Sequence, residues 1–246
     1  MSMKLKDNGI TDLDLWKAKA PPMGGDKQWK PGRSAMELAD YMTKKLPNMP
    51  EEIAEVLLNF TNKNAEFDWS AEYVTNLTPF GLGRGEGRNH DAFLWNSDVV
   101  VGIEGKADEP LGSQTVNTAL KTQSANKLHR IQGMIEMIFG GKPEAHGNIR
   151  YQLITASVAT LLEATKRNVK NAVLLVIVFK KPGYYIENGV KKTYYCEKNI
   201  QKNNEDIAVF LKETKAAEQN GMYLIPTSYG KEAGINLNFK KIEIFP

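Results

Sequence analysis

The sequence predicts an α/β fold in which helices flank one central mixed β-sheet. Apolar residues recur at helical spacing in two early segments, and from Phe67 they alternate with polar residues, as in a half-buried strand. Residues 172–179 are entirely apolar between Asn171 and Lys180, which is typical of a central strand buried on both faces. This order of elements favours a single sheet with helices packed against it.

Residues 1–32 are expected to form an irregular N-terminal arm, because this segment is rich in Pro and Gly pairs that favour turns. Trp16 and Trp29 are expected to anchor the arm to the rest of the protein. Residues 33–246 would then form a single domain, since no linker or repeat interrupts them. Its C-terminal part, residues 181–246, carries no motif that indicates a role.

The remaining elements follow from local spacing and from turn formers. Ser34 and Glu37 have the spacing of a capping box at the start of a helix, and a second helix is predicted after Pro50. A glycine-rich loop is predicted at residues 81–87. The other predictions, in chain order, are strands at 67–73, 91–95 and 99–106, helices at 118–139 and 150–167, a strand at 172–179, a helix at 203–218, and strands at 222–225 and 239–244.

The composition limits the kind of site. The formal net charge is only +3, so a nucleic-acid-binding surface would have to concentrate its Lys and Arg locally. A single cysteine, Cys196, excludes an internal disulfide and a multi-cysteine zinc site. Three histidines make a histidine-rich metal site a poor prediction, which leaves oxygen ligands and a hard cation such as Mg²⁺. Without an apolar leader or a bilayer-length apolar stretch, a cytoplasmic protein is expected.

The most informative motif is Glu104-x-Lys106 at the end of an apolar run, with Asp91 shortly upstream. Residues two apart in a strand share a face, so Glu104 and Lys106 would emerge side by side. Burying these charges is costly unless each has a partner. A divalent cation bound by Asp91 and Glu104, with Lys106 beside a phosphate, would supply partners and suits phosphodiester hydrolysis. A solvated surface ion pair is the alternative.

The order of elements, together with Asp91, Glu104 and Lys106, resembles the PD-(D/E)XK nuclease superfamily, which has the restriction-endonuclease-like fold. The resemblance spans about residues 30–180. His90 stands where the superfamily motif has proline. Three segments are similar to an uncharacterised bacterial branch of that superfamily, namely residues 30–39, 103–112 and 150–153.

The resemblance implies that Asp91 and Glu104 bind Mg²⁺, for which Mn²⁺ could substitute. Lys106 would orient the attacking water or stabilise the charge of the transition state. The superfamily often has a further acidic ligand on its first core helix, and Glu37 is the candidate here, with helix capping as its alternative role. Glu72 could reach the same site, although solvent exposure is the default expectation for it.

Three arginines and a glutamine are further candidates. Arg150 and Gln152 open the helix at 150–167 and would grip phosphate or position a water, whereas a surface role is the alternative for a helix-start arginine. Arg84 and Arg88 border the glycine-rich loop, whose backbone amides would lie against a nucleic-acid backbone. A flexible hairpin is the alternative interpretation of that loop.

The predicted function is therefore a magnesium-dependent nuclease, with DNA as the favoured substrate. Two alternatives remain open. One is a non-catalytic nucleic-acid-binding or interaction module that retains the fold, and the other is a metal-dependent hydrolase acting on RNA or nucleotides. Many relatives implied by the resemblance dimerise, so a homodimer is an open alternative to a monomer. A role at a membrane has no support in the sequence.

Overall fold

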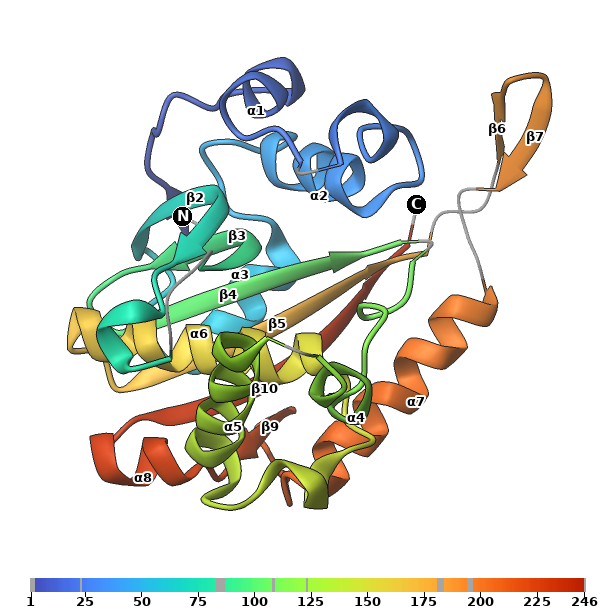
Figure 1. The fold of residues 1–246 in the computed structure, drawn as a ribbon. Coiled ribbons are helices and arrows are strands. Elements are labelled where there is room, and N and C mark those ends of the chain that lie inside the picture. The colour runs from blue at the N-terminus through green and yellow to red at the C-terminus, as the bar shows by residue number, and fades with distance from the viewer. Residues whose placement is uncertain are drawn as a thin grey trace.

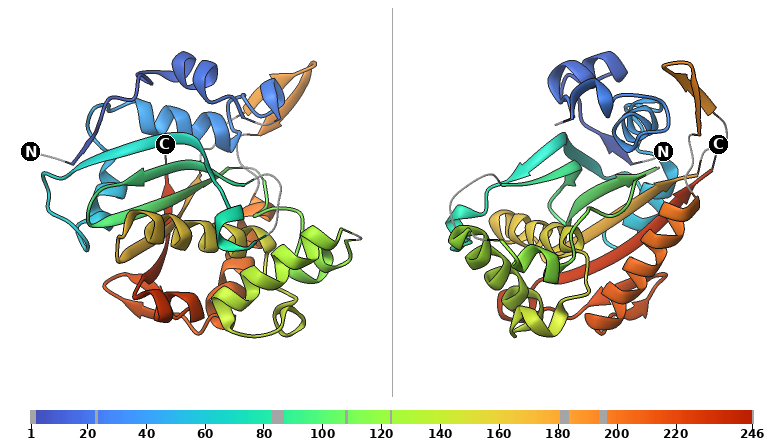
Figure 2. Two further views of the ribbon diagram at one scale, coloured as in Figure 1. Left: turned by 60° about the vertical axis from the view of Figure 1, so that its left-hand side comes forward. Right: turned by 45° about the vertical axis from the view of Figure 1, so that its right-hand side comes forward.

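The computed structural model describes residues 3–22, 24–82, 87–107, 109–122, 124–180, 184–193 and 197–245. Its centre is an eight-stranded mixed sheet with the strand order β1-β2-β3-β4-β5-β10-β9-β8. Helices cover both faces of this sheet (Figure 1, Figure 2). The predicted α/β class, with a central mixed sheet flanked by helices, is confirmed.

The strands of the sheet are β1 Lys4–Leu5, β2 Glu66–Thr75, β3 Arg88–Trp95, β4 Val99–Lys106, β5 Asn171–Phe179, β8 Ala217–Gln219, β9 Met222–Ile225 and β10 Asn236–Ile244. The α-helices are α1 Leu13–Lys19, α2 Ser34–Thr43, α3 Glu51–Leu57, α4 Val116–Leu120, α5 Ala125–Phe139, α6 Tyr151–Arg167, α7 Glu197–Glu213 and α8 Ser228–Ala233. A separate hairpin, β6 Tyr184–Glu187 and β7 Val190–Thr193, projects from the body (Figure 1).

The sheet separates two hydrophobic cores. Strands β2, β3 and β4 form an antiparallel meander, and β5 pairs in parallel with both β4 and β10. Along β4, Val99 and Val101 pack into the core that contains α1 to α3, whereas Val100 packs into the core that contains α4 to α7. The same alternation directs Glu104, at the far end of β4, towards α6.

The expectation of an irregular N-terminal arm is wrong for the described part of residues 1–32. This segment contains β1, which pairs in parallel with β2, and α1, which begins at a side-chain cap provided by Asp12. Met3, Leu5 and Trp16 are 1–2 % exposed and belong to the core on the α2 side. A two-residue strand is too short to recognise from its spacing, but the Asp12 cap is a helix signal that the sequence does contain.

The predicted capping box at the start of α2 is also wrong. The cap position is Arg33, and Ser34 lies inside the first turn, where its hydroxyl donates a hydrogen bond to the Glu109 carboxylate. The Glu37 carboxylate accepts a hydrogen bond from the Gly32 N–H (2.7 Å). Because α2 starts one residue earlier than the predicted capping box requires, the Glu37 carboxylate contacts the Gly32 N–H instead of closing that box.

Two predicted helices have different bounds. The helix expected at 118–139 is two helices, α4 and α5, because Ser124 caps a new start by accepting from the Lys127 N–H (3.3 Å). The helix expected at 203–218 begins earlier, as α7, and ends before β8. The predicted bounds of β4 agree with the structure, and the core positions of β5 are buried as expected. No helix in the described ranges combines the length and the apolar composition needed to cross a membrane.

Candidate functional site

The candidate site forms where strand β2 stops alternating regularly. Ala71 packs into the core on the α2 side, but Tyr73, two residues further, contacts the core on the α6 side. The change occurs at Glu72, which has a left-handed φ of +46° and makes no pair in the β2–β3 ladder. The other non-glycine residues with positive φ lie in turns or at helix ends, at Asn168, Asn188, Lys215 and Asn220. Glu72 is therefore a strained position inside a strand.

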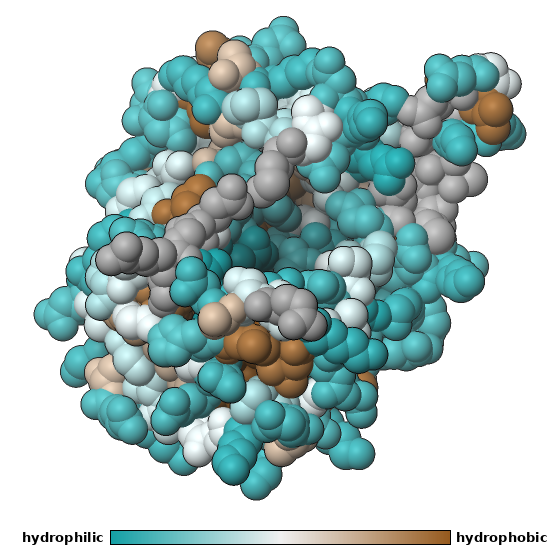
Figure 3. All heavy atoms as spheres, viewed as in Figure 1, coloured by the Kyte–Doolittle hydropathy of each residue, from teal (hydrophilic) through white to brown (hydrophobic). Residues whose placement is uncertain are grey.

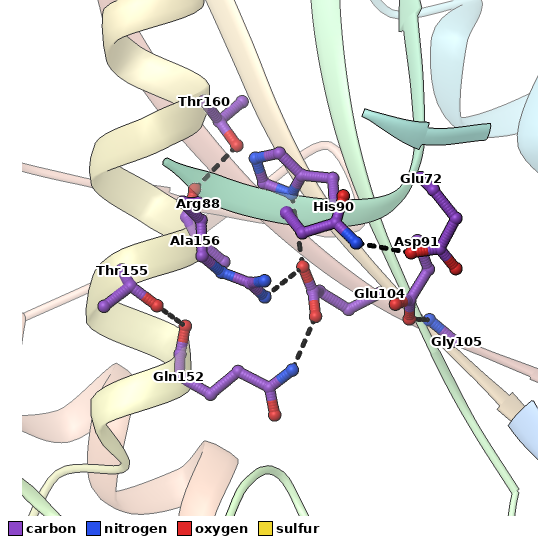
Figure 4. A network of polar contacts seen from close by, with 11 residues as sticks. Glu72, Arg88, His90, Asp91, Glu104, Gly105, Gln152, Thr155, Ala156 and Thr160 are labelled. Atoms are coloured by element: carbon purple, nitrogen blue, oxygen red, sulfur yellow. Dashed lines mark hydrogen bonds and ion pairs between the residues drawn. The ribbon is translucent and has the colours of Figure 1, made fainter. Parts of the chain in front are cut away.

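Strand β3 makes the matching change on the other side of this pair. Ala92 and Ile103 form the last pair of the β3–β4 ladder towards the site, so the two strands separate beyond it. The Asp91 carboxylate occupies the place next to β4 and accepts a hydrogen bond from the Gly105 N–H (2.8 Å). His90 is consequently turned to the face of the sheet that carries α6 (Figure 4). The separation of the strands leaves room for a ligand beside the carboxylate.

Glu104 has partners on three sides (Figure 4). It is 1 % exposed, and its carboxylate accepts hydrogen bonds from Arg88 Nη2 (2.6 Å) and Gln152 Nε2 (2.7 Å). His90 Nδ1 lies 3.2 Å from the same carboxylate. Burial acts to raise the pKa of Glu104, but Arg88, His90 and Lys106 outweigh it and hold that pKa well below its ordinary value. Glu104 is therefore ionised at neutral pH.

Two further carboxyl groups converge on this position. Burial, together with the Glu104 carboxylate, raises the pKa of Asp91 to about 6, against the opposing effect of Lys106 and Arg88. Burial and the Asp91 carboxylate raise the pKa of Glu72 to about 7, although Asn89 donates a hydrogen bond to it. Like charges this close favour protonation, and a divalent cation would relieve the same repulsion.

Lys106 brings a buried positive charge to the site. Lys106 is 6 % exposed, and its charge lowers the pKa of both Asp91 and Glu104, although among the described residues no hydrogen bond and no ion pair within 4 Å involves its ammonium. It lines a cleft of about 620 Å³, together with Glu72, Asp91, Arg88 and Gln152. This face of the molecule is hollowed at its centre, where the visible residues are hydrophilic (Figure 3). A largely buried lysine that lines the cleft without a direct contact to a carboxylate favours an anion as the ligand of the cleft.

The other predicted site residues lie elsewhere. Glu37 lines a different hollow, formed by α2, α3 and the C-terminal residues, and its carboxylate faces the Gly32 N–H. Arg150 caps α6 and donates from Nε to the Asp206 carboxylate (2.6 Å) of α7, where both side chains are largely buried. The structure thus does not bring Glu37 or Arg150 into the cleft. Arg84 lies outside the described residues.

A family model described as a domain of unknown function, DUF6946, matches residues 10–239. The chain belongs to this family. No curated protein matches the chain, and no solved structure matches it. The chemistry of this DUF6946 member therefore has to be argued from its own side chains.

The donor set of this DUF6946 protein fits magnesium better than zinc. No group of three or more His, Cys, Asp or Glu side chains is arranged to hold a metal ion in the part of the chain that the structure describes. Magnesium is commonly bound by one or two carboxylates while it keeps several waters, whereas zinc takes three or four His, Cys or carboxylate ligands. Asp91 lines the cleft, whereas Glu104 is 1 % exposed and is not part of the cleft lining, so the pair meets the magnesium requirement if Glu104 exchanges one of its partners for the cation.

The sequence predicts two residues of the site only in part. It places His90 at the proline position of the motif without giving it a role, and it allows Glu72 to reach the site although solvent exposure is the default expectation. The strand predicted at 91–95 starts later than β3, which begins at Arg88. The spacing of two between Arg88 and His90 places both on one face of the longer strand. The change at Glu72, where β2 turns its side chains to the opposite face of the sheet, has no comparable pattern in the sequence.

Proposed function

We propose that this DUF6946 protein is a magnesium-dependent nuclease that hydrolyses phosphodiester bonds in DNA. The observation that carries the proposal is the position of Lys106, a largely buried lysine that lines a cleft together with Asp91 and makes no ion pair within 4 Å among the described residues. A phosphate would supply the missing anion. The resemblance of Asp91, Glu104 and Lys106 to the PD-(D/E)XK motif supports the same chemistry.

Each side chain has a role in this proposal. Asp91 and Glu104 would hold Mg²⁺, or Mn²⁺ in its place, and the bound ion would lower the pKa of a coordinated water and neutralise phosphate charge. Lys106 stabilises the negative charge that develops on the phosphate. Gln152, by donating to Glu104, keeps that carboxylate in a fixed orientation (2.7 Å). Arg88 keeps Glu104 ionised and so ready to bind a cation.

The direct test is cleavage of supercoiled plasmid, linear single-stranded DNA and RNA in the presence of Mg²⁺, Mn²⁺ or EDTA. Lys106→Met keeps the length of the side chain but removes its charge, and we expect it to lower the cleavage rate by roughly 10²- to 10³-fold. Lys170→Met, at an exposed lysine before β5, is the matched control and should cleave as the wild type does. Cleavage at the wild-type rate by Lys106→Met would falsify the assignment.

A second function is favoured by one specific observation. Glu104 already has three polar partners without any metal, as expected of a non-catalytic nucleic-acid-binding module. Such a module predicts that calorimetry detects no Mn²⁺ binding and that Asp91→Asn leaves oligonucleotide binding unchanged. The nuclease predicts Mn²⁺ binding that Asp91→Asn abolishes. The RNA arm of the cleavage experiment distinguishes DNA from RNA as the substrate.

A further inference from the structure

A second hollow adjoins the proposed catalytic cleft, and we call it the side compartment. Its volume is about 410 Å³, and it is lined by Leu77 and Gly87 between β2 and β3, by the segment after β4, and by helices α5 and α6. Arg88, Gly112, Ser113 and Gln152 line both hollows, so the two adjoin. The proposed hydrolysis itself makes no use of the side compartment.

The walls of the side compartment combine apolar and polar groups. The ring of Tyr151 provides aromatic surface, and Leu77 and Met134, which are 2 % and 0 % exposed, complete the apolar lining. Gln114 provides an amide whose Oε1 accepts from Lys127 Nζ (3.2 Å), and Arg130 provides a guanidinium whose Nε donates to the Leu82 carbonyl (3.3 Å). An inorganic anion would not need the apolar surface, and an aliphatic ligand would not need the amide or the cation. A nucleobase has two apolar faces and a polar edge, and proteins bind unpaired bases with this combination of groups.

The wall between the hollows is fixed by its neighbours. Gly112 has a left-handed φ of +68°, and a β-carbon there would lie 3.3 Å from the Gln152 side chain, so glycine permits this close approach. Asn203 of α7 holds the preceding residues, since its side chain accepts from the Leu111 N–H (2.7 Å) and donates to the Glu109 carbonyl (3.0 Å). The compartment is therefore pre-formed, and the C-terminal part of the chain supports it.

Arg88 lies at the boundary of the two hollows. Its Nη2 donates to Glu104 on the catalytic side (2.6 Å), while its Nε is buried and has no acceptor among the described residues. Because Arg88 lines both hollows and contacts Glu104, a ligand in the side compartment would lie next to the proposed catalytic cleft.

We propose that the side compartment binds an unpaired base of the nucleotide next to the scissile phosphate, so that the substrate is a single-stranded segment. In continuous duplex each base is stacked and paired, and a base could enter only after unpairing. This inference rests on the proposed function, because it places the base relative to the phosphate beside Lys106. It goes beyond that function by naming the strandedness of the substrate.

The test measures binding of the intact protein to fluorescein-labelled DNA by fluorescence anisotropy in EDTA, where cleavage is suppressed. The probes are a short single strand, the same sequence as a duplex, and single strands with one abasic site at successive positions. We expect the single strand to bind at least ~10-fold more tightly than the duplex. One abasic position should lose most of that advantage, because only one base enters the compartment.

Two variants examine the walls. Tyr151→Leu should weaken single-strand binding by roughly 5- to 100-fold, the usual range for losing one aromatic stack, while duplex binding stays unchanged. Gln114→Ala is the second variant in case Tyr151→Leu unfolds, and it should lower single-strand binding by roughly 3- to 10-fold. Tyr41→Leu is the matched control, because Tyr41 lies in a different hollow and donates to Glu52 (2.8 Å).

The outcomes separate this inference from the proposed function. Equal affinity for single strand and duplex, or an equal loss of both in Tyr151→Leu, overturns the base-binding compartment. Cleavage of duplex without preference overturns it as well, while the nuclease proposal stands. Selective single-strand binding that depends on Tyr151, without cleavage when Mg²⁺ or Mn²⁺ is added, supports the compartment but rejects the nuclease.

Discussion

Replacing Asp91 with asparagine should stabilise the metal-free protein near neutral pH even though it removes a proposed metal ligand. Burial and the neighbouring Glu104 carboxylate raise the pKa of Asp91 from 3.8 to about 6. At a pH where Asp91 is ionised in both the folded and the unfolded protein, that pKa difference corresponds to roughly 3 kcal/mol of unfolding free energy. Asp91 keeps some contact with solvent at the cleft, so screening reduces the effect, and we expect Asp91→Asn to add roughly 1–2 kcal/mol.

The effect has a defined dependence on pH. Because the pKa is raised, the folded state of the wild type holds the Asp91 proton more tightly than the unfolded state does. The stabilisation that this provides is complete below the ordinary pKa of 3.8 and is lost as the pH rises through about 6. The stability difference between Asp91→Asn and the wild type should therefore be small near ~pH 4 and reach its full value above ~pH 6.5.

Urea unfolding in EDTA, followed by circular dichroism at several pH values, measures this difference. Asp68→Asn on the neighbouring strand is the control, because Asp68 is 44 % exposed and pairs with Lys6 at the surface (2.9 Å). Its free energy of unfolding should change by less than about 0.5 kcal/mol and should not follow the same pH course. A destabilised Asp91→Asn, or a stabilisation that is independent of pH, would refute the argument that burial and the Glu104 carboxylate raise the pKa of Asp91.

Other variants test the placement of single residues. Arg150→Met leaves the more distant Lys202 (3.5 Å) as the one cation paired with Asp206 among the described residues. Urea unfolding should therefore show a loss of roughly 2–4 kcal/mol while cleavage by the folded protein persists, and lost cleavage at unchanged stability would contradict this. In Gly102→Ala the new β-carbon would lie 2.5 Å from Thr160 Oγ1 and 2.6 Å from His90 Cε1, which should cost roughly 1–3 kcal/mol in the same assay and slow cleavage. Mn²⁺ at about 100 times its dissociation constant should stabilise the wild type by roughly 2.7 kcal/mol in thermal unfolding but leave Asp91→Asn unchanged.

Sequence spacing predicts best the strands whose apolar side chains are buried against the helices on the faces of the sheet. Strand β4 has its predicted bounds, and the apolar run of β5 is central because it pairs with strands on both sides. The elements that escaped prediction are short, as β1, α1 and α8 are, or begin at a cap that competes with neighbouring candidates. Local propensity favours Ser34 over Arg33 as the cap of α2, but the Ser34 hydroxyl instead makes a tertiary contact with Glu109.

The residues of the candidate site also differ in how well the sequence predicts their positions. Asp91, Glu104 and Lys106 could be predicted to converge because adjacent strands place their ends together, and Gln152 joins them through the first turn of α6. Arg150 could not be placed, because its partner Asp206 comes from α7, far along the chain. The partner of a buried charge depends on the fold as a whole, and spacing within one element carries no information about it.

The departures from regular structure in this chain gather at one place, which is itself an argument for function. The left-handed backbone of Glu72, the end of the β3–β4 ladder at Ala92, the raised pKa of Asp91 and the buried ammonium of Lys106 all adjoin the same cleft. Each of these features lowers the stability of the ligand-free protein, and elsewhere in the described chain left-handed residues sit in turns or caps where they cost little. Stability alone does not explain why a strained glutamate, an aspartate with a raised pKa and a largely buried lysine lie together at one cleft. A phosphate and a divalent cation would compensate the lysine and the carboxylates at once, and neither ligand alone would do so.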